Sequence, residues 1–148
     1  MALSAKKFFT SEQQDDIKQA VLNAELDTSG EIRVHIENKC AGDVLIRAAQ
    51  IFKKLKMDRT ELHNGVLIYL AIENRKFAII GDAGIDAVVP ENFWEQIKTN
   101  MLNLFREGQF AKGLSEAILA AGAQLKQHFP HLKNDVNELP DDISFGSK

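Results

Sequence analysis

The sequence predicts an α/β protein, a three-layer α/β/α sandwich built on a small mixed sheet of about three to five strands. Segments with helical and strand periodicity alternate along the chain. The run "VLIYLAI", residues 66–72, is continuously apolar, which is typical of a strand buried on both faces. The polar turn "ENRK" and a second apolar run, "FAIIG", follow it, so residues 66–81 predict a β-hairpin.

The first half of the chain predicts two helices with a strand between them. Ser11 and Gln14 form a capping-box pattern at the start of "SEQQDDIKQAVLNAEL", whose apolar residues recur at helical spacing. Residues 31–37, "EIRVHIE", alternate between apolar and polar, which predicts a strand covered on one face. Asp43 is the expected N-cap of the next helix, "VLIRAAQIFKKLKM".

The second half predicts two more helices after the hairpin. Pro90 suits the first turn of a helix through "ENFWEQIKTNMLNLF", and "REGQF" interrupts the helical pattern. The segment "AKGLSEAILAAGAQLKQHF" predicts a last helix that Pro130 stops. We expect residues 1–133 to form one domain and residues 134–148, which are polar and contain a proline, to be a flexible tail.

Composition excludes several classes of protein. The net charge of -3 is small and the charges are mixed, so we expect no nucleic acid partner. Cys40 is the only cysteine, which excludes an intrachain disulfide and a cysteine-built metal site. The longest apolar run is too short to span a membrane, and the first residues lack the apolar stretch of a signal peptide. We therefore expect a cytoplasmic protein without a membrane span.

The expected connectivity brings three loops to one end of the sheet. The first two strands and the helix between them form a parallel unit, and the third strand returns antiparallel. If the first two strands are neighbours, "LDTSGE", "DRTELHNG" and "GDAGID" therefore share one rim. The rule for open parallel sheets points instead to the opposite end, at "ENKCAGD" and "ENRK". The residues gathered at the favoured rim are Asp27, Glu31, Arg59, Asn64, Asp82 and Asp86.

The loop "GDAGID" has two interpretations. Calcium and magnesium require several oxygen ligands at once, and Asp82 and Asp86 supply some of them, with Asp27 or Glu31 from a neighbouring loop. The loop is not an EF-hand, because the positions that need glycine and glutamate hold alanine and phenylalanine. The competing interpretation is that both aspartates are ordinary turn residues, held by hydrogen bonds to their own backbone.

Two other residues offer weaker chemistry. "CAGDVLIR" has six residues between Cys40 and Arg47, where cysteine-dependent phosphatases have five, and three of them belong to a helix face. We therefore interpret Cys40 as an ordinary free thiol. His63 is the histidine nearest the rim, but no second histidine or cysteine partners it at a metal-binding spacing.

Four stretches together resemble the TPM domain family, a phosphatase-like domain named after thylakoid-lumen and photosystem II repair proteins. They are "TSGEIRVHI", "NGVLIYLAIENRKFAIIGDAGID", "FREGQFAKGL" and "NELPDDI". The resemblance implies an α/β/α sandwich and a divalent-cation site, often occupied by calcium, near "GDAGID". Where the family commonly has glycine, an aromatic, glycine, leucine and glutamate, this chain reads "DAGID". Asp86 is thus the ligand that the resemblance carries over, and Asp82 is an added acid.

The resemblance leaves two functional classes open. Plant members of the family have been credited with acid phosphatase activity, while many bacterial members have no assigned reaction. In an enzyme, a bound cation would activate water on a phosphate ester, Arg59 or Arg106 would compensate the phosphate charge, and Asp82 would help as a base. We therefore expect a small bacterial-type TPM domain that binds calcium or magnesium and has weak metal-dependent phosphatase activity. The alternative is a non-catalytic domain that binds a protein partner and holds a structural cation.

Overall fold

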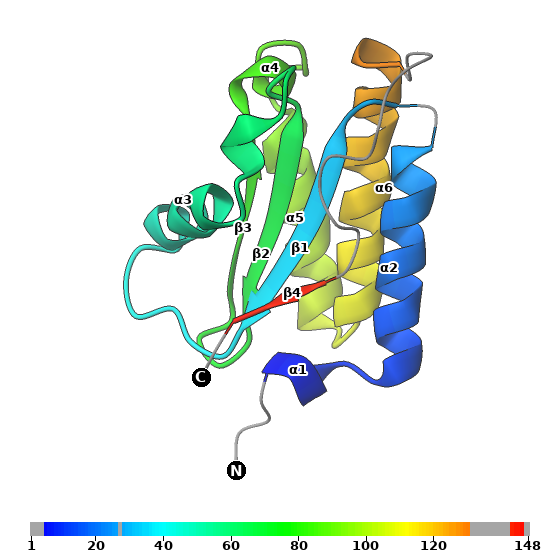
Figure 1. Cartoon of the computed structure of the whole chain (residues 1–148). Helices are drawn as coiled ribbons and strands as arrows, with labels where there is room; N and C mark the ends of the chain where they lie inside the picture. The colour runs from blue at the N-terminus through cyan, green and yellow to red at the C-terminus, as the bar shows by residue number, and fades with distance from the viewer. Residues whose placement is uncertain (1–4, 27, 131–142, 147–148) are drawn as a thin grey trace.

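A computed structural model describes residues 5–26, 28–130 and 143–146 of the chain. These residues form one mixed sheet in the order β3-β2-β1-β4. β1 is parallel to β2 and β4, and β3 is antiparallel to β2. Helices cover both faces of the sheet, which confirms the predicted α/β/α sandwich (Figure 1). The strands are β1 (Glu31–Glu37), β2 (Gly65–Ala71), β3 (Lys76–Gly81) and β4 (Ser144–Phe145).

The two helical layers are unequal. Three long helices cover one face, namely α2 (Ser11–Glu25), α5 (Phe93–Arg106) and α6 (Phe110–His128). A single helix, α3 (Val44–Lys54), covers the other. The short helices are α1 (Ala5–Phe8), the 3-10 turn η1 (Met57–Arg59) and α4 (Ala83–Asp86). Within the described residues, no helix has both the length and the apolar character needed to cross a bilayer.

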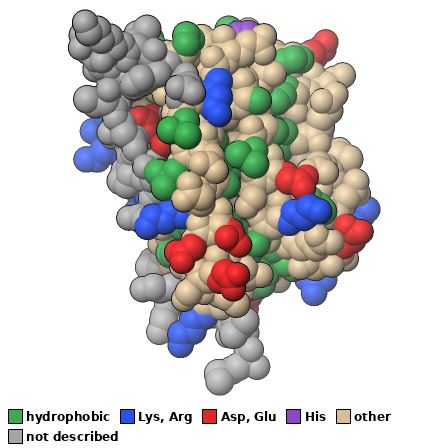
Figure 2. Space-filling view, turned by 90° about the vertical axis from the view of Figure 1, so that its right-hand side faces the viewer, with side chains coloured by type: hydrophobic (Ala, Val, Ile, Leu, Met, Phe, Trp, Pro, Cys, Tyr) green, Lys and Arg blue, Asp and Glu red, His purple; other side chains and the backbone are tan. Residues whose placement is uncertain are grey.

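Figure 2 shows the face formed by α2 and α6. Hydrophobic side chains lie scattered between polar ones, and acidic side chains gather toward the end where α2 begins. Glu12, Asp15 and Asp16 in the first two turns of α2 are all exposed. They lie near the helix N-terminus, where the helix dipole favours negative charge.

The alternation of β1 divides its side chains between the two layers. Ile32, Val34 and Ile36 are fully buried in the core that packs under α2 and α6. Because successive side chains of a strand point to opposite faces, His35 and Glu37 lie on the α3 side. Both are nonetheless buried, with 4% of their surface exposed. The expectation that β1 is covered on only one face is therefore incomplete.

Four local details differ from the sequence-based predictions. The capping box of α2 lies one residue earlier, because the side chain of Thr10 accepts from Gln13 N at 3.0 Å and Gln13 Oε1 accepts from Thr10 N at 3.0 Å. α5 begins at Phe93, three residues after Pro90, with Asn92 as its N-cap. The predicted "GDAGID" loop contains a helical turn, α4, which Asp82 caps.

The fourth difference is β4, a two-residue strand in residues 134–148, where the sequence predicts no strand. His35 and Ile36 of β1 pair with it, and Gly146 N donates to Ile36 O at 2.8 Å. Ile143 and Phe145 pack against the main core, so apolar residues in a mostly polar segment hold this strand against the sheet. Residues 134–142 of the predicted tail lie outside the described residues.

Candidate functional site

The pairing of the strands places the three predicted loops at one end of the sheet. Glu31 pairs with Gly65 at the start of β1 and β2, and Val66 pairs with Gly81 at the end of β3. The assumption that the first two strands are sheet neighbours is therefore confirmed. We call this end the rim, defined as residues 28–31, 59–65 and 81–86; α4 lies on it at the top of Figure 1.

Backbone hydrogen bonds dock the "GDAGID" segment onto the loop before β2. The carbonyl oxygen of His63 accepts from Gly84 N at 2.8 Å, and Gly65 O accepts from Asp82 N at 2.9 Å. His63 itself has a left-handed backbone, with φ of 51°. Left-handed geometry is uncommon outside glycine, and this one turns the carbonyl of His63 toward the start of α4.

Each rim aspartate uses one carboxylate oxygen for local structure. Asp82 caps α4 through Oδ1, which accepts from Ala83 N at 2.8 Å, and its Oδ2 lies 3.3 Å from His63 Nδ1. Asp86 Oδ1 accepts from Trp94 Nε1 at 2.9 Å. The turn interpretation thus accounts for one oxygen of Asp82, whereas Asp86 Oδ1 is held by the side chain of Trp94. The second oxygen of Asp86 makes no hydrogen bond to a described residue, and that of Asp82 meets only His63.

Asn64 adds an unpaired amide oxygen to the rim. Its side chain is buried, and its Nδ2 donates to Ser29 Oγ at 3.4 Å. Its Oδ1 has no hydrogen-bond partner among the described residues. A buried polar atom without a partner costs about 1–3 kcal/mol, so this oxygen is available to a ligand that the described residues do not supply.

The donors at the rim fit a hard divalent cation only in part. Within the described ranges, no group of three or more His, Cys, Asp or Glu side chains is arranged to hold a metal ion. Two carboxylates and an amide are nevertheless oxygen donors of the kind that calcium and magnesium take together with backbone carbonyls and water. Asp27 lies outside the described residues. Glu31 is on β1, with β2 between it and β3, which separates the backbones of Glu31 and Asp82 by about 10 Å.

The two candidate arginines lie at opposite ends of the sheet. Arg59 ends η1 and is exposed on the segment that leads into the rim. Arg106 is in the last turn of α5 and lines a pocket with Leu70 and Phe77, near the end of β2 and the start of β3. Arg59 therefore lies at the same end of the sheet as Asp82 and Asp86, and Arg106 lies at the other end.

A buried charged network that sequence reasoning missed lies at the opposite end of β1. Glu37 accepts from Arg47 Nε at 2.8 Å and from Arg47 Nη2 at 2.9 Å. Tyr69 OH also donates to Glu37, and His35 Nε2 lies 3.3 Å from its Oε1. Tyr69 stands in the middle of the apolar run of β2, and a buried tyrosine hydroxyl requires a partner. A tyrosine in this apolar run was therefore the one feature of the sequence that indicated a buried polar partner.

The network has strongly shifted protonation equilibria. Burial raises the pKa of Glu37, but hydrogen bonds from Arg47, Tyr69 and His35 outweigh it and lower the pKa to about 2. Burial lowers the pKa of His35 and is only partly offset by Glu37. Burial and the Glu37 hydrogen bond both raise the pKa of Tyr69. The carboxylate is thus ionised and fully engaged, and it ties β1 to β2 and α3.

The fold and the rim together define an α/β/α domain with paired aspartates above the starts of two parallel strands. The sequence profile of the TPM domain matches residues 4–124. The chain belongs to the TPM domain family.

Three solved structures share this fold. The BA42 protein of the psychrophilic bacterium Bizionia argentinensis, known from NMR, is 45% identical with a TM-score of 0.87. That match covers 95% of this chain and 97% of BA42. No curated protein sequence matches the chain.

The other two structures are more distant and support the fold alone. The N-terminal domain of a P. gingivalis protein is 19% identical with a TM-score of 0.71, over 85% of this chain and 83% of that one. The N-terminal domain of the cg2496 protein from Corynebacterium glutamicum is 14% identical with a TM-score of 0.63, over 80% and 74% of the two chains.

Proposed function

We propose that this TPM domain binds one hard divalent cation, calcium or magnesium, at the rim. The observation that carries the proposal is the buried Asn64 Oδ1, which lacks a partner among the described residues. Asn64 stands between His63 and Gly65, whose carbonyl oxygens hold the segment of Asp82 and Asp86. The two carboxylates each keep an oxygen that the local fold does not require. Backbone carbonyls and water would complete the six to eight oxygen ligands that calcium takes.

A second candidate function is metal-dependent hydrolysis of a phosphate monoester at the same rim. A bound cation would polarise the phosphoryl oxygens and lower the pKa of bound water. The observation that favours this function is Arg59, whose exposed side chain has no ion pair with a described residue and is available to a phosphate. Asp82, with Oδ2 facing His63, is the residue best placed to act as a base.

Apolar side chains at the rim and just beyond it favour recruitment of a protein partner. Leu62, next to His63, is 43% exposed, and Val88, just after α4, is 40% exposed. Large apolar residues beside a polar site are typical of protein interaction surfaces. In this alternative the cation orders the two loops and no turnover occurs.

Calorimetric titration of calcium and of magnesium tests cation binding. Asp86→Asn keeps an oxygen for Trp94 Nε1, and Asp82→Asn keeps the N-cap, because asparagine caps a helix as well as aspartate does. Each removes one negative charge, so we expect each to weaken binding about tenfold or more. Asp16→Asn, which changes an exposed aspartate on α2, is the matched control and should bind as the wild type does. Equal affinities in all four proteins, or no binding at millimolar cation, would contradict the proposal.

Hydrolysis of a generic aryl phosphate then separates the two functional classes. An enzyme predicts cation-dependent turnover that falls in Asp82→Asn and in Arg59→Gln, while Arg59→Gln keeps its cation affinity. A binding domain predicts the same slow rate in wild type and variants, with cation affinity intact in the wild type.

A further inference from the structure

The edge of β1 that faces away from β2 is closed in two different ways. Near the rim, Ile32 N donates to Glu25 Oε2 at 2.7 Å, so a side chain of α2 satisfies this backbone group. Farther along, β4 pairs with His35 and Ile36, and Gly146 N donates to Ile36 O at 2.8 Å. Unpaired backbone groups on a sheet edge are a template for another strand. β4 therefore covers a stretch of β1 that would otherwise be an open edge.

The β4 segment, residues 143–146, fills this edge with side chains of complementary chemistry. Ile143 and Phe145 pack against the main core. Ser144 lies between them and points to the other face of the sheet, where its Oγ is 2.9 Å from His35 Nδ1. His35 is buried, and a buried ring nitrogen needs a hydrogen-bond partner. A segment that binds at this edge therefore needs a hydroxyl between two apolar residues.

The last position of the β4 segment requires glycine. A Cβ at Gly146 would be 2.4 Å from the Cβ of Glu37 and 2.8 Å from its Oε1. Glu37 is not free to move aside, because Arg47 and Tyr69 hold its carboxylate. A larger residue at this position would push the strand outward and break its hydrogen bond to the carbonyl of Ile36. The edge thus selects an apolar residue, a hydroxyl, a second apolar residue and a glycine, in that order.

The attachment of β4 to the sheet is short, and the chain leading to it is long. β2 pairs along the whole of β1, whereas β4 pairs at His35 and Ile36. Residues 131–142 lead to the β4 segment from Pro130, which pairs with Thr28 at the rim. The backbone from Thr28 to His35 spans about 23 Å, while twelve extended residues reach about 40 Å. The β4 segment therefore has enough chain to leave the edge while α6 stays packed.

We propose that the edge of β1 at His35 and Ile36 is a docking site for an extended segment of another protein, which adds parallel to β1 and displaces β4. The segment carries a large apolar residue, a serine or threonine, a second large apolar residue and a glycine. Main-chain hydrogen bonds supply affinity in this mode of recognition, and places for alternate side chains supply specificity. β4 competes for the edge at an effective concentration on the order of millimolar, so it sets the affinity that a partner must exceed. The site is separate from the rim and needs no cation there.

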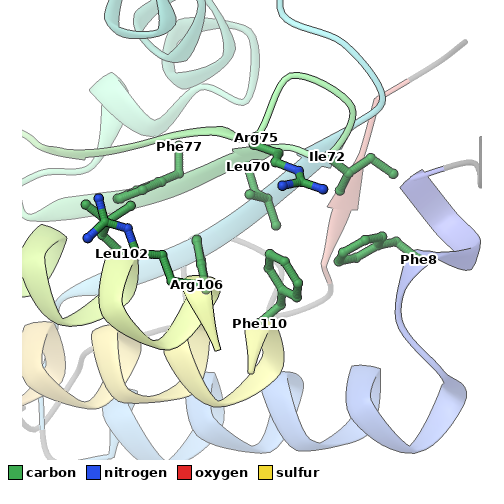
Figure 3. A pocket seen from close by; sticks show the side chains of 9 residues that line it. Phe8, Leu70, Ile72, Arg75, Phe77, Leu102, Arg106 and Phe110 are labelled. Carbon is green, nitrogen blue, oxygen red and sulfur yellow. The ribbon is translucent and has the colours of Figure 1, made fainter. Parts of the chain in front are cut away.

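An apolar pocket at the end of the sheet opposite the rim is the competing place for an apolar peptide (Figure 3). It has a volume of about 130 Å³ and lies between the β2–β3 hairpin, α1 and the turn that joins α5 to α6. Arg75 and Arg106 lie on opposite sides of it. No residue of the β4 segment lines the pocket. Binding there would therefore shift amides of residues 102–110 and not those of β1.

Amide NMR titration of the full chain with the peptide DISFGSK, the sequence of residues 142–148, tests the proposal. Gly146→Ala in the protein weakens its own β4 and leaves the edge of β1 unchanged. We expect this variant to lose the wild-type amide positions of residues 35–36, and the peptide to restore them. The peptide should bind the variant at least about tenfold tighter than the wild type, in which β4 competes. Gly42→Ala, where a Cβ meets nothing within 4 Å, is the control and should bind as the wild type does.

Changes in the peptide test the selection at each position. Alanine in place of the glycine should abolish binding, and valine in place of the serine should weaken it, whereas threonine should preserve it. Equal affinity for all four peptides, shifts confined to residues 102–110, or no shifts in Gly146→Ala at millimolar peptide would overturn the proposal. A wild-type dimer that Gly146→Ala dissociates would overturn it too, because a second copy of the chain would then be the occupant of the edge.

Discussion

The carbonyl oxygen of His63 accepts a hydrogen bond from the backbone N–H of Gly84 at 2.8 Å. Together with the bond from Asp82 N to Gly65 O, this contact joins the loop before β2 to the turn after β3 and holds the segment that carries Asp82 and Asp86. Gly84 is at the closest approach, because a Cβ there would be 2.2 Å from Leu62 O and 2.6 Å from His63 O. Both obstacles are backbone atoms, which cannot rotate away as a side chain can.

Gly84→Ala should therefore force the two loops apart. We expect a loss of about 1–3 kcal/mol in the free energy of unfolding, the usual cost of overpacking, measured by urea denaturation. Gly42→Ala is the matched control, since a Cβ at Gly42 meets nothing within 4 Å. If both variants were equally stable, the close docking of the loops would be wrong.

Trp94 should report cation binding by its fluorescence. It is the only tryptophan of the chain, and its Nε1 donates to Asp86 Oδ1 at 2.9 Å. A cation on Asp86 changes the charge next to the indole, so calcium should shift the emission in a saturable way that chelation reverses. Asp86→Asn keeps the hydrogen bond but should lose the response. An unchanged spectrum at saturating calcium would argue that Asp86 is not a ligand.

Loss of the charge on Glu37 should destabilise the fold. Glu37→Gln leaves Arg47 without its ion pair. Because Arg47 is 39% exposed and solvent screens its charge, we expect a loss of about 1–2 kcal/mol at neutral pH, less than a fully buried pair would cost. Because the pKa of Glu37 is lowered from 4.5 to about 2, its contribution is fully present above pH 4.5 and is lost as the pH falls toward 2. Urea denaturation over this pH range should show that the free energy of unfolding falls less steeply with decreasing pH in Glu37→Gln than in the wild type. Glu73→Gln, on the exposed hairpin turn, should behave as the wild type does.

His35 should make the free energy of unfolding depend on pH in a higher pH range than Glu37 does. Burial lowers its pKa in the folded state from 6.5, so the unfolded chain binds the proton more readily. The free energy of unfolding should therefore be largest above pH 6.5 and fall as the pH drops below it. His35→Gln should flatten this part of the profile, whereas His63→Gln should leave it in place. If the free energy of unfolding fell more steeply with decreasing pH in His35→Gln than in the wild type, the lowered pKa assigned to His35 would be wrong.

Much of the architecture follows from periodicity in the sequence. The apolar run of β2 and the alternation of β1 predict both strands, and "ENRK" predicts the hairpin. The meeting of the rim loops follows once β1 and β2 are neighbours, since β3 must then return to the end where both begin. These features depend on local pattern and chain connectivity, which one sequence contains.

Other features depend on tertiary contacts that no local pattern encodes. The polar residues of β1 predicted a face exposed to solvent. Instead, Glu37 on that face is buried and binds Arg47 and Tyr69, which lie in other elements of the fold. The sequence placed Asn64 at the rim, but the unpaired oxygen of its side chain is visible only in three dimensions. The pocket of Arg75 and Arg106 needs the hairpin and the α5–α6 turn to be adjacent, which the sequence does not specify.

The most direct test of the central claim is a two-dimensional amide NMR titration with calcium, repeated with magnesium. If the rim binds a cation, saturable shifts will appear at residues 81–87, His63 and Asn64, and Asp86→Asn will weaken them while Asp16→Asn leaves them unchanged. Shifts absent at millimolar cation, or spread over the acidic start of α2 instead of the rim, would contradict a cation site and leave partner recruitment as the function of this surface.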